Sequence, residues 1–171
     1  MSEELFAANP TTQAMWLAKQ EICELQRLYA KATDLLCLNA PDGSDEARQI
    51  YHRIFTPDAV IRASGVEPQI GPDAWVELVV SALEEFDVTQ HFIGTQLANV
   101  SQLPNGSNAA GAGHLMSHLQ AWHVRPDGYL WHFIGTYDSQ VVHTAGGGWQ
   151  ICDMTLSEVS QDYRRLQPRD G

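Results

Sequence analysis

The chain has 171 residues, of which 44% are hydrophobic and 18% are charged, the composition of an ordinary globular protein with one domain. Its formal net charge of −11 argues against a surface for nucleic acid or for an anionic membrane, because phosphates would be repelled. The start, Met1-Ser2-Glu3-Glu4, lacks the basic and apolar parts of a secretion signal, and no segment approaches the roughly 20 apolar residues that span a bilayer. We therefore expect a cytoplasmic protein.

The first part of the chain predicts two helices. Asn9-Pro10-Thr11-Thr12 is typical of a helix start, and apolar residues then recur three or four positions apart to about Leu38. This apolar stripe consists of Ala18, Ile22, Leu25, Tyr29, Ala32 and Leu36. Turn residues at 39–43 end the first helix, and a second is expected from Ser44 to Phe55.

The rest of the chain predicts one more helix and then mainly strands. A short strand is expected over 59–62, and a third helix begins at Gly71-Pro72-Asp73 with Trp75 on its buried side. Four long strands follow, separated by turn residues, and are expected over 88–101, 109–125, 129–143 and 149–156. From Ser157 the chain is polar, which predicts a short helix or a frayed end.

Helices followed by a meander of antiparallel strands predict an α+β domain, in which a curved sheet wraps a long helix and leaves a concave space for a ligand. We expect this domain over 13–156, between an N-terminal tail of residues 1–12 and a C-terminal tail of residues 157–171. The three cysteines are widely spaced and are expected to be buried free thiols: Cys23, Cys37 and Cys152.

Asp34 and His91 are the candidate chemical groups. Asp34 precedes the apolar run 35–38, where burial of an unpaired ion would cost several kcal/mol. Burial of Asp34 therefore predicts a partner, and His91, near the start of the first long strand, is the obvious candidate. The alternative is a solvated aspartate, because a wheel of about 100° per residue places Asp34 nearly opposite the apolar stripe. A lone strand histidine is also typical of a core or rim position.

Two other groups of residues have a plainer interpretation. His114 and His118 are four residues apart, the spacing of a metal-binding pair on a helix, but their strand context places them on one face of a sheet. No motif supplies a carboxylate at a spacing that would indicate a third metal ligand. We expect surface or pocket histidines and no metal. The tryptophans of the long strands are expected in the core or in a subunit interface: Trp122, Trp131 and Trp149.

Five segments, taken together in this order, resemble the SnoaL-like group of the nuclear-transport-factor-2-like (NTF2-like) superfamily. They are residues 29–34, 55–60, 89–94, 135–138 and 148–151. The group includes scytalone dehydratase, bile-acid dehydratase and lindane dehydrochlorinase. The resemblance extends over about residues 13–156 and implies an α+β cone, a deep pocket and cofactor-free elimination or isomerisation by an Asp–His pair.

The resemblance also implies roles for individual residues. Asp34 matches the aspartate on the first helix, His91 matches the histidine that acts as base, and Tyr29 matches the tyrosine of bile-acid dehydratase. His118 corresponds to the second pocket histidine of scytalone dehydratase, with a strand register that is open by one or two residues. Asp138 falls near the pocket asparagine of that enzyme.

The chain departs from the family pattern at two places. Met154 stands where the dehydrochlorinase and bile-acid enzymes carry an arginine on the last strand, and Arg62-Ala63 stands where scytalone dehydratase has a second tyrosine. The group that stabilises the leaving group is therefore missing or supplied differently. We expect Met154 and Trp75 to contact the ligand, together with His118 and Asp138.

The sequence thus predicts a cofactor-independent dehydratase or isomerase that acts on a small hydrophobic molecule of the cyclic hydroxy-ketone type. One alternative is a binding protein of the same fold without turnover. Another is an accessory role, like that of the small subunit of ring-hydroxylating dioxygenases. Because exposed sheet faces in this superfamily usually pair chains, we expect a homo-oligomer, with a trimer slightly ahead of a dimer.

Overall fold

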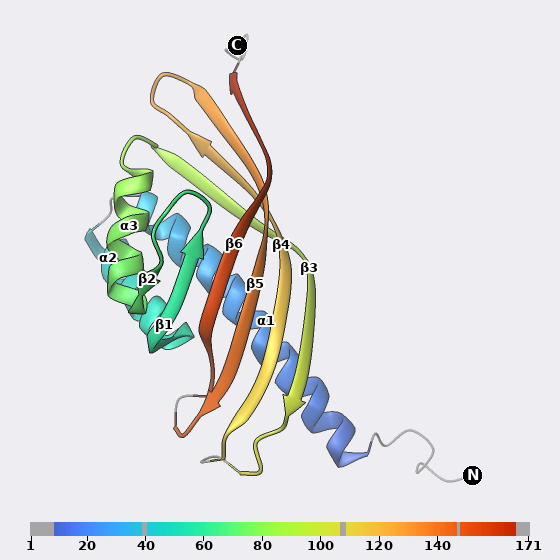
Figure 1. Ribbon diagram of the computed structural model, residues 1–171. Helices are drawn as coiled ribbons and strands as arrows, with labels where there is room; N and C mark the ends of the chain where they lie inside the picture. The colour runs from blue at the N-terminus through green and yellow to red at the C-terminus, as the bar shows by residue number, and fades with distance from the viewer. Residues whose placement is uncertain (1–8, 39–40, 107–108, 147, 167–171) are drawn as a thin grey trace.

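The computed structural model describes residues 9–38, 41–106, 109–146 and 148–166. The elements in these ranges are α1 (Pro10–Cys37), α2 (Pro41–Ile54), β1 (Phe55–Ala63), β2 (Gln69–Ile70), α3 (Gly71–Leu83), β3 (Val88–Gln102), β4 (Gly111–Val124), β5 (Tyr129–Thr144) and β6 (Gly148–Arg165) (Figure 1). Within the same ranges, no helix is long and apolar enough to cross a bilayer. The α+β class predicted from the sequence is confirmed.

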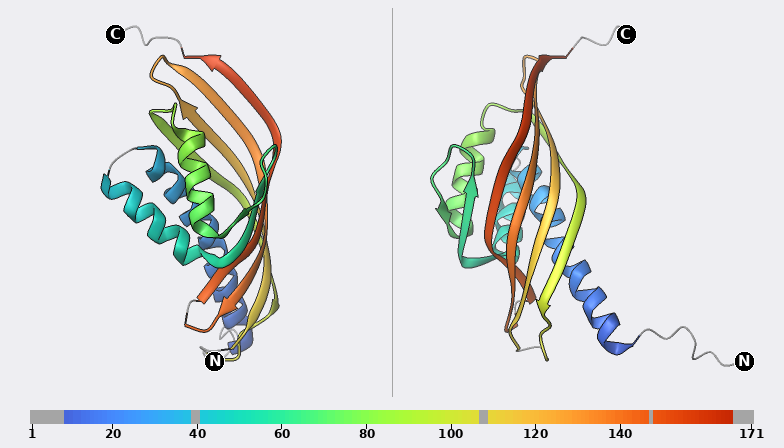
Figure 2. Two further views of the ribbon diagram at one scale, coloured as in Figure 1. Left: turned by 60° about the vertical axis from the view of Figure 1, so that its left-hand side comes forward. Right: turned by 45° about the vertical axis from the view of Figure 1, so that its right-hand side comes forward.

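The strands form one sheet in the order β2-β1-β6-β5-β4-β3. β1 runs parallel to β6, and every other neighbouring pair is antiparallel. Figure 2 shows that the sheet is strongly bent and that the helices lie on its concave side. α1 packs along β3, and α3 packs against β1, so that helical side chains face the middle of the sheet from two directions.

The long helix α1 forms as its sequence predicts. The Asn9 side chain accepts a hydrogen bond from the backbone N–H of Thr11 at 2.9 Å, and Pro10 occupies the first turn, where a missing N–H costs nothing. All six residues of the predicted apolar stripe are buried. Burial of the large side chains of this stripe contributes about 1.5–3 kcal/mol each, so the stripe fixes the side of α1 that faces the sheet.

Two boundaries near α2 differ from the prediction. The helix begins at Pro41, within the segment predicted as a turn, because proline is well suited to the first helical turn. It ends at Ile54, and the chain is already extended at Phe55, so residues 56–58 belong to β1 and do not form a separate break. Residues 39 and 40 of the predicted turn lie outside the described residues.

The end of the chain differs most from the prediction. The expected short helix or frayed end after Leu156 is wrong, because β6 continues as a strand to Arg165. Its last part pairs with β5, from Gly135 opposite Glu158 to Tyr129 opposite Arg165. This half of β5 offers backbone groups that need partners, and a polar strand with exposed side chains can supply them. We call residues 157–165 the C-terminal arm.

Two irregularities in β6 decide which of its side chains face the helices. Gln140 pairs with Asp153 but Val141 pairs with Ile151, so Cys152 is an extra residue. A second shift follows Glu158: Gly135 pairs with Glu158 but Ile134 pairs with Ser160, so Val159 is an extra residue. Each bulge moves the inward-facing set by one residue, because strand side chains alternate between the two faces.

An aromatic cluster fills the middle of the core. The ring of Tyr29 makes edge contacts with those of Tyr51, Phe55 and Tyr137, at centroid distances of 5.5, 6.1 and 5.3 Å. The Tyr51 hydroxyl lies 2.7 Å from the Thr33 hydroxyl, which itself donates to the carbonyl oxygen of Tyr29. Two rings of this cluster, those of Tyr29 and Tyr137, line a cavity.

The cysteines are free, as predicted. Cys23 and Cys37 are buried on α1, whereas Cys152 at the bulge of β6 is only partly buried.

Candidate active site

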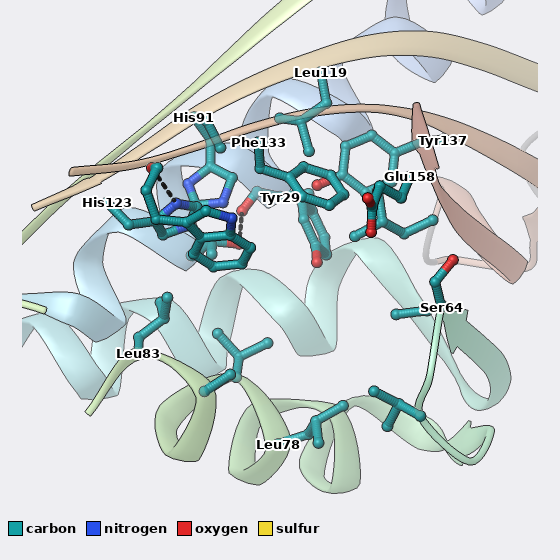
Figure 3. A pocket seen from close by; sticks show the side chains of 18 of the residues that line it. Tyr29, Ser64, Leu78, Leu83, His91, Leu119, His123, Phe133, Tyr137 and Glu158 are labelled. Atoms are coloured by element: carbon teal, nitrogen blue, oxygen red, sulfur yellow. Dashed lines mark hydrogen bonds between the residues drawn. The ribbon is translucent and has the colours of Figure 1, made fainter. Parts of the chain in front are cut away.

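A cavity of about 340 Å³ lies between α3, the concave face of the sheet and the Tyr29 side of α1 (Figure 3). Most of its wall is apolar or aromatic. The lining residues are Tyr29, Thr33, Ala63, Ser64, Val66, Trp75, Leu78, Val79, Ala82, Leu83, His91, Leu119, Ala121, His123, Trp131, Phe133, Tyr137, Leu156, Glu158 and Gln161. An apolar cavity of this size with a few polar groups is suited to a small hydrophobic ligand.

Asp34 and His91 are in direct contact at one wall of this cavity. The Oδ1 atom of Asp34 accepts hydrogen bonds from the His91 Nδ1 at 2.7 Å and from the Thr89 hydroxyl at 2.9 Å. Its Oδ2 atom accepts one from the backbone N–H of His91 at 3.1 Å. The predicted pairing is therefore present, and the alternative of an unpartnered, solvated Asp34 is wrong.

The helical wheel places Asp34 opposite the buried stripe, and a wheel considered alone implies that this side of α1 faces water. In the fold, the start of β3 runs along that side, so the last turns of α1 have neighbours on both sides. The Asp34 side chain is 28% exposed and that of His91 is 7% exposed. Asp34 faces a groove between α1 and β3, while His91 lines both this groove and the cavity.

This geometry determines how the His91 ring can act. A carboxylate can only accept, so the Nδ1 of His91 carries the hydrogen that it donates to Asp34. The Nε2 atom makes no hydrogen bond to any residue that the structure describes, and in the neutral ring it holds the free lone pair. His91 thus presents a basic nitrogen, with Asp34 placed to stabilise the imidazolium that forms when this nitrogen takes a proton.

His123 is a second histidine of the cavity, which the sequence prediction missed. Its ring stands perpendicular to that of His91, with centroids 5.3 Å apart, and stacks on Trp131 at 4.3 Å. Its Nδ1 donates a weak hydrogen bond to the carbonyl oxygen of Trp131 at 3.4 Å. Burial, together with the neighbouring His91, lowers the pKa of His123 to about 4. His123 is therefore neutral near pH 7, and its Nε2 can accept a hydrogen bond.

Tyr29 lies in the cavity wall, and Trp75 lies beside it. The Trp75 indole N–H donates to the Tyr29 hydroxyl at 3.1 Å. Burial raises the pKa of Tyr29 to about 12, and burial likewise holds the pKa of Tyr137 well above its ordinary value. Both phenols therefore remain protonated at neutral pH and can donate to a ligand oxygen.

The structure corrects two predicted ligand contacts. His118 and Asp138 are exposed, on the face of the sheet that points away from the helices, and neither lines the cavity. Asp138 pairs there with His114, whose Nε2 lies 2.9 Å from the carboxylate. On β4 the inward residues are Leu119, Ala121 and His123, so His118 points to the opposite face. On β5 Tyr137 points inward, so its neighbour Asp138 points outward.

Met154 is also corrected. It is fully buried in the core and does not line the cavity. Met154 shares the inward face of β6 with Leu156, so its position along the strand, and not its face, keeps it from the cavity. The residues of β6 that reach the cavity are Leu156, Glu158 and Gln161. The last two belong to the C-terminal arm, which was predicted to lie outside the domain.

Some of these residues could have been found from the sequence. On β4, the small or apolar residues at positions 115, 117, 119 and 121 have the same parity as position 123 and not as position 118, which points to His123 in place of His118. The arm carries no such alternation, and Glu158 could not have been found this way. Within the described residues, no three His, Cys, Asp or Glu side chains are grouped as metal ligands.

Comparison with solved structures gives related folds. A hexachlorocyclohexane dehydrochlorinase (LinA) of type 2 matches with a TM-score of 0.73 and 11% identity, over 94% of this chain and 99% of that one. A putative scytalone dehydratase from Novosphingobium aromaticivorans matches with a TM-score of 0.68 and 16% identity, over 91% and 93%. An NTF2-like superfamily protein from Salmonella enterica gives 0.61 and 16%, over 91% and 98%.

At identities this low, the structural matches establish the fold alone, which is the NTF2-like fold expected from the resemblance. No curated protein sequence matches the chain significantly. The sequence does match the family model of the SnoaL-like domain, over residues 15–155, which is most of its length. The chain therefore belongs to the SnoaL-like family.

Proposed function

We propose that this protein is a cofactor-independent lyase of the dehydratase type, or an isomerase, that acts on a small hydrophobic cyclic hydroxy ketone. The observation that carries the proposal is the 2.7 Å contact between Asp34 and His91 at the wall of an apolar cavity. A dehydrochlorinase and a putative scytalone dehydratase share the fold, which supports elimination chemistry as the reaction class.

The first step is abstraction of a proton from the carbon next to the substrate carbonyl. The His91 Nε2 takes this proton, the C–H electron pair moves toward the carbonyl, and negative charge develops on the carbonyl oxygen. Asp34 stabilises the resulting imidazolium through the hydrogen bond to Nδ1. Tyr29 and Tyr137, which stay protonated, donate to the developing oxyanion.

The second step depends on the substrate. With a hydroxyl on the β carbon, the C–O bond breaks as the new C=C bond forms, and the hydroxyl leaves as water with the proton returned by His91. Without a leaving group, His91 returns the proton to a different carbon, and the double bond moves. Scytalone dehydratase has a second tyrosine on its first strand, where this chain has Arg62-Ala63. In the proposed mechanism Tyr137 supplies this second phenol.

The test is incubation in D₂O with a panel of cyclic β-hydroxy ketones, followed by mass spectrometry. The wild-type protein should give deuterium uptake or loss of water, and both Asp34→Asn and His91→Ala should abolish it. Asp138→Asn is the matched control, because it makes the same substitution in an Asp–His pair that lies on the outer face of the sheet. This control should turn over like the wild type.

Two results would contradict the proposal. Turnover that survives in both Asp34→Asn and His91→Ala removes the pair from the mechanism. Tight binding without deuterium uptake or water loss for every ketone of the panel assigns the protein to the binding class. Asp34→Asn should keep the fold, because the amide can still accept through its oxygen, and circular dichroism of each variant checks this.

A further inference from the structure

Glu158 lies at the end of the cavity remote from the two histidines. Figure 3 shows Glu158 and Ser64 on one side of the cavity, His91 and His123 on the other side, and aromatic rings between them. Glu158 comes from the C-terminal arm and is exposed, so its carboxylate sits at a rim that water reaches. It makes no hydrogen bond or ion pair with any residue that the structure describes.

The charge of the cavity is set by this residue. Among the lining residues within the described ranges, Glu158 is the only carboxylate, and none is a lysine or an arginine. The protein as a whole carries a formal net charge of −11. A ligand with a carboxylate at this end would meet repulsion without a compensating cation, whereas a hydrogen-bond donor or a cation would be attracted.

The rings that line the cavity act in the same direction. Phe133 and Tyr137 flank Gly135, the residue of β5 that pairs with Glu158, and both line the cavity. The face of an aromatic ring carries partial negative charge and attracts a cation, and an ammonium group gains more from it than a hydroxyl does. Carboxylate and rings together thus favour an ammonium at this end.

We propose that Glu158 is a specificity-determining residue, which selects hydrophobic ligands that carry an ammonium or, second best, a hydroxyl at the end remote from His91, and which rejects carboxylates there. The inference rests on the proposed function only for placing the reacting end of the ligand at His91. Selection at the Glu158 end is a property of binding and is measured without turnover.

The experiment uses three probes that share one ring and nearly one length: tryptamine, tryptophol and indole-3-propionate. Isothermal titration calorimetry on the full chain at low salt measures the three dissociation constants. The wild type should bind tryptamine most tightly and indole-3-propionate least tightly. An exposed charge pair contributes only weakly, but tryptamine and indole-3-propionate carry opposite charges, so the two effects add in the ratio of their dissociation constants. Glu158→Gln should therefore reduce this ratio by about fivefold.

The matched control is Asp162→Asn. Asp162 lies on the same strand, is exposed, does not line the cavity, and its replacement removes the same single charge. This control should keep the wild-type ratio, which separates a local effect of Glu158 from a change in net charge. Glu158→Lys should reverse the order and favour indole-3-propionate.

An equal ratio in the wild type and in Glu158→Gln would overturn the proposal, and so would an Asp162→Asn protein that changes as much as Glu158→Gln. Failure of all three probes to bind the wild type would also count against it. The measurement is repeated in His91→Ala. A preference that persists there supports the role of Glu158 even if no hydroxy ketone is turned over, so the two proposals can fail independently.

Discussion

The imidazole rings of His91 and His123 stand at 90° to one another with their centroids 5.3 Å apart, on the adjacent strands β3 and β4. His91 is hydrogen-bonded to Asp34, whereas His123 is stacked on Trp131 and has no carboxylate partner among the residues that the structure describes. The two rings therefore have different surroundings. In the proposed mechanism His91 accepts a proton, and the lowered pKa of His123 keeps that ring neutral beside it.

This neutrality predicts how stability depends on pH. In the unfolded chain His123 takes a proton near its ordinary pKa of 6.5, but in the folded protein only near 4. Between these values the unfolded state binds more protons, so the free energy of unfolding falls as the pH falls from 6.5 toward 4 and levels off below. The loss due to His123 is about 3 kcal/mol, at 1.36 kcal/mol per pKa unit.

Urea unfolding of the wild type and of His123→Phe from pH 7 to pH 4 isolates this contribution. Phenylalanine keeps a ring that can stack on Trp131 but cannot titrate. The difference in unfolding free energy between the two proteins should shift in favour of the variant as the pH falls. A difference that stays constant over this range would mean that His123 is protonated in the folded protein.

Thr89 is expected to be a positioning residue, because its hydroxyl donates to the same Asp34 oxygen that holds His91. Hydrogen bonds to charged groups contribute about 1.5–3 kcal/mol, so Thr89→Ala should lower kcat about tenfold. Thr89→Ser keeps the hydroxyl and should restore most of the rate. If serine and alanine give the same kcat, the hydroxyl does not support the pair.

Tyr137 is expected to contribute to the reaction through its hydroxyl. Loss of one donor to a developing oxyanion typically costs about 100-fold in kcat or more, which is the expected effect of Tyr137→Phe. Tyr51→Phe is the matched control, because Tyr51 belongs to the same buried aromatic cluster but does not line the cavity. It should keep kcat and lose about 1 kcal/mol of stability with its hydrogen bond to Thr33. Equal kcat losses in both variants would indicate a packing effect.

Gln26 on α1 is fully buried, and neither its amide nitrogen nor its amide oxygen bonds to another described residue. A buried polar group without a partner costs about 1–3 kcal/mol, so Gln26→Met, which keeps the length of the side chain, should raise the free energy of unfolding by about that amount. Thr33→Val is the contrast, because the Thr33 hydroxyl is bonded on both sides, and it should destabilise. A destabilised Gln26→Met protein would contradict the prediction.

The homo-oligomer stays a prediction. Two apolar side chains on β3 support it, because Phe92 is 58% exposed and Leu97 is 59% exposed. Light scattering should give the mass of a trimer or a dimer, and replacement of both residues by lysine should shift the protein toward monomer. A monomer mass for the wild type would refute the prediction.

The amino-acid sequence alone predicts the order of the elements and the buried face of α1, because periodic apolar residues act locally and at short range. It also determined the pairing of Asp34 with His91, once the order of five segments was compared with a family. The same residues taken alone left Asp34 open between a paired and a solvated carboxylate, since a helical wheel contains no neighbouring strand.

Which strand residues face the cavity depends on the three-dimensional pairing of the strands. A shift of one residue exchanges the two faces of a strand, so the prediction named His118 and Asp138, whereas His123 and Tyr137 line the cavity. Met154 lies on the same face of β6 as Leu156, but at a position along the strand that is buried in the core. The bulges that set this register depend on pairing between distant segments. The arm that carries Glu158 is polar and gains its strand form from the free backbone groups of β5, an interaction that no local pattern encodes.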